Sequence, residues 1–165
     1  MADRTAEVVM GSDEYKPERL FTIDQANATL PLVRAITGDL ATLAKDVVER
    51  RHRLALLTSG RDLKLGDPYS DELAQMETDL ERDAIRLQGY VDELRELGVE
   101  PKGAVEGLVD FPCQMDGKLV LLCWKLGEPE VLYWHDLDSG FGGRQPLTAG
   151  SVSGGYGHDD ESYND

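Results

Sequence analysis

Apolar and small residues recur at alternating steps of three and four between residues 30 and 54, the spacing of a helix that buries one seam. The seam consists of Leu30, Val33, Thr37, Leu40, Ala44, Val47, Arg51 and Leu54. Thr22 followed three residues later by Gln25 forms a capping box, so the helix is predicted to begin there. We expect a kink near Pro31, which removes one backbone hydrogen bond, and an acidic partner for Arg51 on a neighbouring helix.

A second helical pattern follows residues 60–68, a segment whose glycines and proline are typical of a loop. Its apolar face consists of Leu73, Met76, Leu80, Ala84, Leu87, Val91, Leu94 and Leu97. Ser70 is the expected N-terminal cap, and Gly98 before Val99 has the pattern of a Schellman motif that ends the helix. Two long helices joined by a short loop lie antiparallel, so we predict a helical hairpin.

From residue 108 the hydrophobic period changes to two, which indicates β-strands. Residues 108–114 and 118–125 flank Asp116-Gly117, a dipeptide typical of a two-residue hairpin turn. This turn pairs Met115 with Lys118, Cys113 with Val120, and Asp110 with Cys123.

A further turn at Gly127-Glu128 leads to a third predicted strand over residues 130–135. That register pairs Lys125 with Glu130, Trp124 with Val131, and Val120 with His135. The predicted fold class is therefore α+β: a long antiparallel helical hairpin followed by a three-stranded antiparallel β-meander.

Alternation along the strands sorts their side chains into two faces. The core face, which should pack on the helical hairpin, holds Val109, Phe111, Cys113, Val120, Leu122, Trp124, Val131, Tyr133 and His135. The other face holds Asp110, Gln114, Leu119, Leu121, Cys123, Lys125, Glu130, Leu132 and Trp134. Its leucines and tryptophan form too large an apolar patch to leave in water, so residues 141–147 or a second subunit should cover it. Because two-fold pairing is the commonest closure, we predict a homodimer.

Both ends of the chain lack the apolar periodicity of the middle. Residues 1–19 are predicted to form a disordered arm, and residues 148–165 a disordered, acidic tail rich in glycine and serine. The remaining residues 20–147 are enough for a single domain with its own core.

The net charge of −15 repels nucleic acid phosphates and anionic membrane surfaces, so we expect neither as a partner. No apolar run resembles a signal peptide or a membrane span, which predicts a cytoplasmic protein. Cys113 and Cys123 should then be reduced, and their spacing fits no zinc-site pattern. A protein partner remains compatible with this charge.

Four segments in order resemble an uncharacterised bacterial family, domain of unknown function 2203. Residues 21–31, 107–112, 122–128 and 134–147 read FTIDQANATLP, GLVDFP, LCWKLGE and WHDLDSGFGGRQPL. The resemblance covers residues 20–147, with a departure at Gly103-Ala104, where the family would have a more polar pair. It implies a small, soluble bacterial protein and supplies no activity, cofactor or catalytic residue.

Carboxylates gather around the only histidine of the predicted sheet. Asp138 follows His135 by three residues, and Asp110 and Glu128 could add further oxygen ligands for a divalent ion. One histidine, with no second histidine or glutamate at helical spacing, is a weak signal for a zinc or iron site. The simpler interpretation is that His135 ends a strand and Asp138 caps a turn, and we assign no metal site.

Asp110 stands within an apolar strand and needs a partner, which Arg144 could supply as an internal ion pair. Alternatively, Arg144 forms an anion or substrate pocket, in which Gly142 and Gly143 allow close approach of the backbone. A catalytic thiol is not expected. His135 would share the core face with Cys113, but with a whole strand between them, which is too far for a hydrogen-bonded Cys–His pair.

The leading functional prediction is a non-enzymatic oligomerisation or protein-interaction module. The alternative is a small metal- or anion-binding enzyme with its site at the end of the meander, drawn from Asp110, Glu128, His135, Asp138 and Arg144. The cofactor is left unknown.

Overall fold

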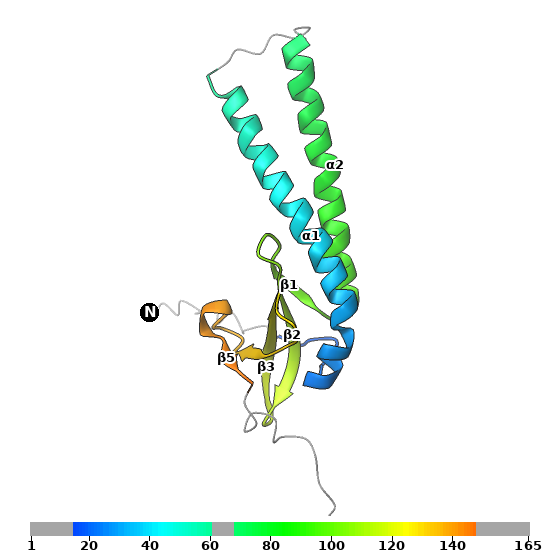
Figure 1. Cartoon of the computed structure of the whole chain (residues 1–165), viewed down its shortest axis with the longest axis vertical. Coiled ribbons are helices and arrows are strands. Elements are labelled where there is room, and N and C mark those ends of the chain that lie inside the picture. Colours follow the sequence, from blue (N-terminus) through cyan, green and yellow to red (C-terminus); the bar gives the residue numbers. More distant parts are fainter. Residues whose placement is uncertain (1–14, 61–67, 148–165) are drawn as a thin grey trace, which may run out of the picture.

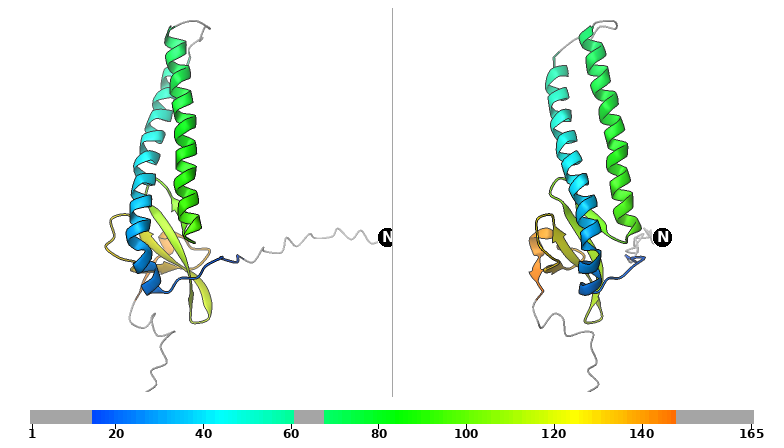
Figure 2. Two further views of the ribbon diagram at one scale, coloured as in Figure 1. Left: turned by 90° about the vertical axis from the view of Figure 1, so that its right-hand side faces the viewer. Right: turned by 45° about the vertical axis from the view of Figure 1, so that its right-hand side comes forward.

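Two long helices precede a five-stranded antiparallel sheet in the computed structural model, which describes residues 15–60 and 68–147 (Figure 1). The helices α1 (Ile23–Thr58) and α2 (Pro68–Glu96) form a hairpin whose far end extends well beyond the sheet (Figure 2). The α+β class is confirmed. The predicted tail, and the predicted arm up to residue 14, lie outside the described residues. No described helix is both long and apolar enough to cross a membrane.

The start of α1 follows the predicted capping box. Thr22 Oγ1 accepts a hydrogen bond from the backbone N–H of Gln25, and Gln25 Oε1 accepts one from the N–H of Thr22, both at 3.1 Å. The helix then continues through Pro31 without ending. The capping residues therefore fix where α1 begins, and the preceding Phe21 ties this end to the sheet, because its N–H donates to the carbonyl oxygen of Pro112 at 2.7 Å.

The seam between the helices is confirmed as far as Val47, and no side chain of α1 beyond that residue is buried. The prediction for Arg51 is wrong: Arg51 is exposed, and Arg50 forms the ion pair with Asp83 of α2. A straight α-helix drifts by about 20° per heptad from a 3.5-residue repeat, so a seam extrapolated from Leu30 misses its target three heptads later. The helices also diverge toward the tip of the hairpin (Figure 1).

The end of α2 has the predicted Schellman geometry. Gly98 adopts φ of 84°, and the N–H of Val99 donates to the carbonyl oxygen of Leu94 at 3.0 Å. Val99 is buried in the core, so this turn delivers the chain directly into the sheet.

The sheet consists of β1 (Glu100–Gly103), β2 (Leu108–Met115), β3 (Lys118–Lys125), β4 (Tyr133–His135) and β5 (Gln145–Pro146), in that spatial order. The three central strands are those predicted, and β1 and β5 are short edge strands that the sequence pattern did not indicate. Asp116 and Gly117 form the turn between β2 and β3 with positive φ, as expected. The predicted β2–β3 pairing is confirmed at every position.

The predicted register of β4 is wrong by one residue. His135 lies opposite Leu121 instead of Val120, and Trp134 lies opposite Leu122. Because side chains alternate along a strand, a slip of one residue moves each of them to the opposite face. His135 therefore leaves the core face, and Trp134 packs against the core.

The cause of the slip is a loop over residues 126–132 in place of the predicted two-residue turn. Two side chains of α1 hold this loop. Asn27 Oδ1 accepts from the N–H of Val131 at 2.7 Å, and Arg34 Nη2 donates to the carbonyl oxygen of Pro129 at 3.1 Å. In addition, the indole N–H of Trp124 donates to the Glu128 carbonyl oxygen at 3.0 Å. The loop thus takes the path that these contacts impose.

The core lies between one face of the sheet and the part of the hairpin nearest to it. Its largest fully buried members include Phe21, Leu40, Leu94, Phe111, Leu122 and Trp124. Phe21 and Phe111 meet edge to face, with ring centroids 5.2 Å apart. On the opposite face of the sheet, Leu121 is buried and lines a cavity together with Phe141, so the segment after β4 covers this part of the face.

Candidate functional site

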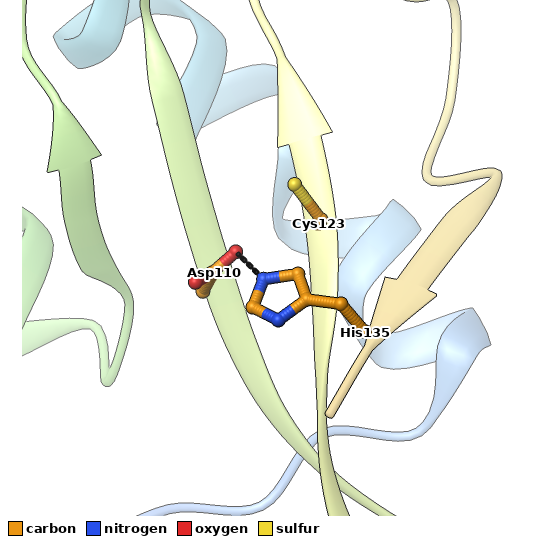
Figure 3. A group of neighbouring side chains, drawn as sticks. All are labelled: Asp110, Cys123 and His135. Atoms are coloured by element: carbon orange, nitrogen blue, oxygen red, sulfur yellow. Dashed lines mark hydrogen bonds and ion pairs between the residues drawn. The ribbon is translucent and has the colours of Figure 1, made fainter. Parts of the chain in front are cut away.

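Three adjacent strands bring Asp110, Cys123 and His135 together on the sheet face opposite the core (Figure 3). Asp110 of β2 lies directly opposite Cys123 of β3, and His135 of β4 reaches across β3 toward Asp110. All three are buried, with Asp110 1% and His135 2% exposed. This grouping follows from the corrected register of β4.

The hydrogen bonds of His135 fix the position of one of its protons. Nδ1 lies 2.7 Å from the carbonyl oxygen of Asp136, and a carbonyl oxygen only accepts, so Nδ1 carries a hydrogen. Nε2 lies 3.1 Å from Asp110 Oδ1. A hydrogen bond between these two atoms needs one more proton, held by either the imidazole or the carboxyl group. Asp110 and His135 thus share a proton in a buried pair.

Burial governs the ionisation of the other groups at this site. Desolvation raises the pKa of Asp110 above its ordinary value, against the opposing effect of His135 and Lys102. Desolvation, reinforced by the Asp110 charge, raises the pKa of the Cys123 thiol to about 12. Cys123 is therefore a neutral thiol at neutral pH in the metal-free protein, and only a nearby cation would favour its thiolate form.

We expect the stability advantage of wild type over Asp110→Asn to shrink as pH rises from acid to neutral, in the presence of chelator. The raised pKa means that the folded chain holds the Asp110 proton more tightly than the unfolded chain. The resulting stabilisation is complete below the unfolded pKa and is lost as pH rises through the folded pKa. Denaturant melts of both proteins across this range measure the difference. A difference independent of pH, or one that grows with pH, would contradict the assignment.

One oxygen of this site lacks a protein partner. Asp110 Oδ2 is buried, with no hydrogen-bond partner within residues 15–60 and 68–147. The site forms part of the wall of a cavity of about 350 Å³. The cavity is also lined by Lys102, Leu108, Leu121, Leu137, Asp138, Gly140 and Phe141. An unpaired carboxylate oxygen in a buried position is costly, so this group is poised for a ligand.

The three side chains have the donor atoms that transition metals prefer. A ring nitrogen of His135, Sγ of Cys123 and a carboxylate oxygen of Asp110 lie within 4.8 Å of one another. His135 already donates from Nδ1 to a backbone carbonyl, the outer contact that orients most histidine ligands. Three protein ligands are the number typical of zinc sites that keep one position open.

Comparison with known proteins identifies the family of this chain. The model of an uncharacterised conserved protein family, DUF2203, matches residues 19–147. The chain belongs to this family. No curated protein and no solved structure matches it. The family description assigns no function, so the function of this DUF2203 protein must be argued from its site.

The predicted pairing of Asp110 with Arg144 is wrong. Arg144 Nη2 lies 2.6 and 2.7 Å from the two carboxylate oxygens of Glu128, while Asp110 takes His135. The Arg144 guanidinium also lies over the rings of Tyr133 and Phe141, 3.9 and 4.7 Å from their centroids. Since Phe141 lines the cavity, this cluster holds the cavity wall of the DUF2203 protein in place.

The five predicted site residues thus divide into two neighbouring groups. Asp110 and His135 belong to the buried centre, and Asp138 lines its cavity. Glu128 and Arg144 form the supporting ion pair. Sequence reasoning missed Cys123 as a site residue, although the predicted turn at Asp116-Gly117 correctly placed it opposite Asp110. The predicted register placed His135 on the opposite face of the sheet, so the three residues were not brought together.

Proposed function

We propose that this DUF2203 protein binds a divalent transition metal ion of the zinc type through Asp110, Cys123 and His135, with one coordination position open to the cavity. The observation that carries the proposal is the close grouping of three buried ligand atoms of different elements. Ligands bonded to zinc at 2.0–2.3 Å stand about 3.3–3.8 Å apart in a tetrahedral site. The 3.1 Å between His135 Nε2 and Asp110 Oδ1 is close to that spacing. Sγ of Cys123 belongs to a group of ligand atoms that all lie within 4.8 Å of one another, so a shift of roughly 1 Å would bring it to the same spacing.

A bound ion would also interact favourably with the buried Asp110 carboxylate, one oxygen of which lacks a hydrogen-bond partner within the described residues, and with Cys123. The charge of a divalent ion offsets the burial of the Asp110 carboxylate and favours the thiolate form of Cys123. Nitrogen and sulfur donors favour zinc-type ions over magnesium and calcium, which take oxygen ligands. A reducing compartment such as the cytoplasm suits this site, because it keeps Cys123 free of disulfides.

The open coordination position would be the binding site of the metal- or anion-binding enzyme considered as the alternative function. A water or a small anionic group would occupy that position, and Lys102 of the cavity wall would favour negative charge beside it. No catalytic residue is assigned beyond the proposed ligands. Metal binding itself is the first step to test.

Purified wild-type protein should bind one equivalent of Co²⁺ or Zn²⁺ and release about two protons per ion, one from the Cys123 thiol and one from the Asp110–His135 pair. Bound Co²⁺ should show thiolate-to-metal absorbance. Cys123→Ser should lose that absorbance, whereas Cys113→Ser should keep it. Cys113 is the matched control because it is also buried and free but lies outside the cluster. Binding by wild type that Cys123→Ser leaves unchanged, or no binding at all, would reject the site.

The second candidate function is the predicted non-enzymatic oligomerisation or protein-interaction module, with a homodimer as its simplest form. Its support now comes from the helices. The predicted apolar patch on the sheet is dispersed, because Trp134 packs on the core and Leu121 lines the cavity. The hairpin, in contrast, carries the exposed apolar side chains Val48, Leu56 and Ile85.

A further inference from the structure

We infer that two copies of the chain associate through the distal parts of their hairpins, residues 45–58 of α1 and 68–85 of α2, with both tips pointing the same way. In this four-helix arrangement, α1 of each copy packs against α2 of the other. The inference rests on the proposed homodimer and names its surface, its orientation and the residues in contact.

The distal hairpin lacks the packing that a two-helix unit needs. No side chain of α1 beyond Val47 is buried, and Leu73 and Leu80 are the buried side chains of α2 in this region. Helices of this kind take most of their stability from tertiary contacts along an apolar face. Val48, Leu56 and Ile85 are 55%, 64% and 74% exposed. A second layer of helices would bury them.

The ion pair between Arg50 and Asp83 fixes the relative height of the two helices. Val48 lies two residues before Arg50, and Ile85 lies two residues after Asp83, so both stand at the same level of an antiparallel hairpin. Leu56 follows Val48 by two turns and extends the same side of α1 toward the tip. A two-fold axis along the hairpin brings Val48 of one copy to the level of Ile85 in the other.

The charges of the two helices identify a second copy as the partner and select its orientation. Residues 45–53 of α1 contain four basic and two acidic residues, whereas residues 71–83 of α2 contain six acidic residues and one basic residue. An axis along the hairpin sets the basic segment of each copy against the acidic segment of the other. An arrangement with opposed tips would instead set basic against basic. Complementary charge thus favours the first arrangement in a chain that otherwise repels its own copies.

Sedimentation of the full chain at micromolar concentration should give a dimer. The Val48→Glu and Ile85→Glu double variant should raise the dimer dissociation constant by about a hundredfold, because it buries unpaired charge at the centre of the contact. Leu32→Glu is the matched control: Leu32 is 52% exposed on the same helix, near the sheet, and its substitution should leave the dimer intact.

A charge exchange tests the orientation. Arg51→Glu with Arg53→Glu should weaken the dimer, and adding Glu77→Lys with Glu81→Lys should restore it, with circular dichroism confirming that helix content is unchanged. A wild-type monomer would overturn both this inference and the proposed homodimer. A dimer that resists the double variant, or that the charge exchange fails to restore, would overturn this surface or orientation and leave the homodimer standing.

Discussion

Replacing His135 by alanine should lower the free energy of unfolding of the metal-free protein by roughly 3–5 kcal/mol at neutral pH, the range for removing one partner of a buried pair. His135 is the hydrogen-bond partner of Asp110 Oδ1, and Oδ2 of the same carboxylate already lacks one. The variant therefore removes the imidazole partner of a buried carboxylate and leaves it only the neutral Cys123 thiol as a neighbour within the site. Urea melts in the presence of chelator measure the loss.

The double variant Asp110→Leu with His135→Leu provides the control for this prediction. Removing both partners avoids a stranded charge, so the double variant should be more stable than His135→Ala despite carrying more substitutions. A loss below about 1 kcal/mol in His135→Ala, the net value of an ordinary hydrogen bond, would show that Asp110 finds another partner.

Arg144→Ala should destabilise the protein by about 3 kcal/mol, the lower end of the range for buried pairs, because its side chain is 11% and that of Glu128 21% exposed. The substitution removes the ion pair and the stacking on Tyr133 and Phe141 together. Phe141 would then lose its support at the cavity wall, so metal affinity should fall as well, although Arg144 is not a ligand.

Arg95→Ala is the matched comparison for Arg144→Ala. Arg95 of α2 pairs with Glu100 of β1, outside the proposed dimer contact, and its side chain is 52% exposed; exposed pairs of this kind contribute at most about 1 kcal/mol. Thermal melts of the two variants should therefore differ clearly. Equal, small effects would mean that water replaces the contacts of Arg144, and that the cavity wall does not depend on them.

Three local signals in the sequence correctly predicted structure, whereas the cap expected at Ser70 is wrong, because α2 begins at Pro68. Thr22 and Gln25 mark the start of α1, Gly98 marks the end of α2, and Asp116-Gly117 fixes the β2–β3 register. In each case the side chains or backbone angles that decide the structure lie within a few residues of one another. Such signals are legible without knowledge of the tertiary fold.

The register of β4 could not be predicted in this way, because its determinants are distant in sequence. Val131 is held by Asn27, 104 positions earlier, and Pro129 by Arg34. Asn27 stands in the first turns of α1 and shows no local sign of this contact. A two-residue turn at Gly127-Glu128 was the shortest solution that local patterning allowed, and it turned His135 to the wrong face.

The candidate site could likewise be predicted only in part from the sequence. Asp110 and His135 attracted attention as polar residues in an apolar sheet, and both belong to the buried centre. Cys123 gives no such signal, since a thiol in a strand resembles any other small apolar residue. Its place in the cluster becomes visible only when β4 brings the His135 imidazole beside it.

The tie between α1 and the loop over residues 126–132 also sets an order of folding. The β2–β3 hairpin closes through neighbouring residues, and such hairpins form in microseconds. The contact between Val131 and Asn27 instead joins residues 104 positions apart. Closing so long a loop has a larger entropic cost than closing the β2–β3 hairpin. β4 therefore joins the sheet after α1 has docked, and His135 arrives with it. A chain emerging during synthesis should therefore form its helices and its first β-hairpin before Asp110, Cys123 and His135 come together.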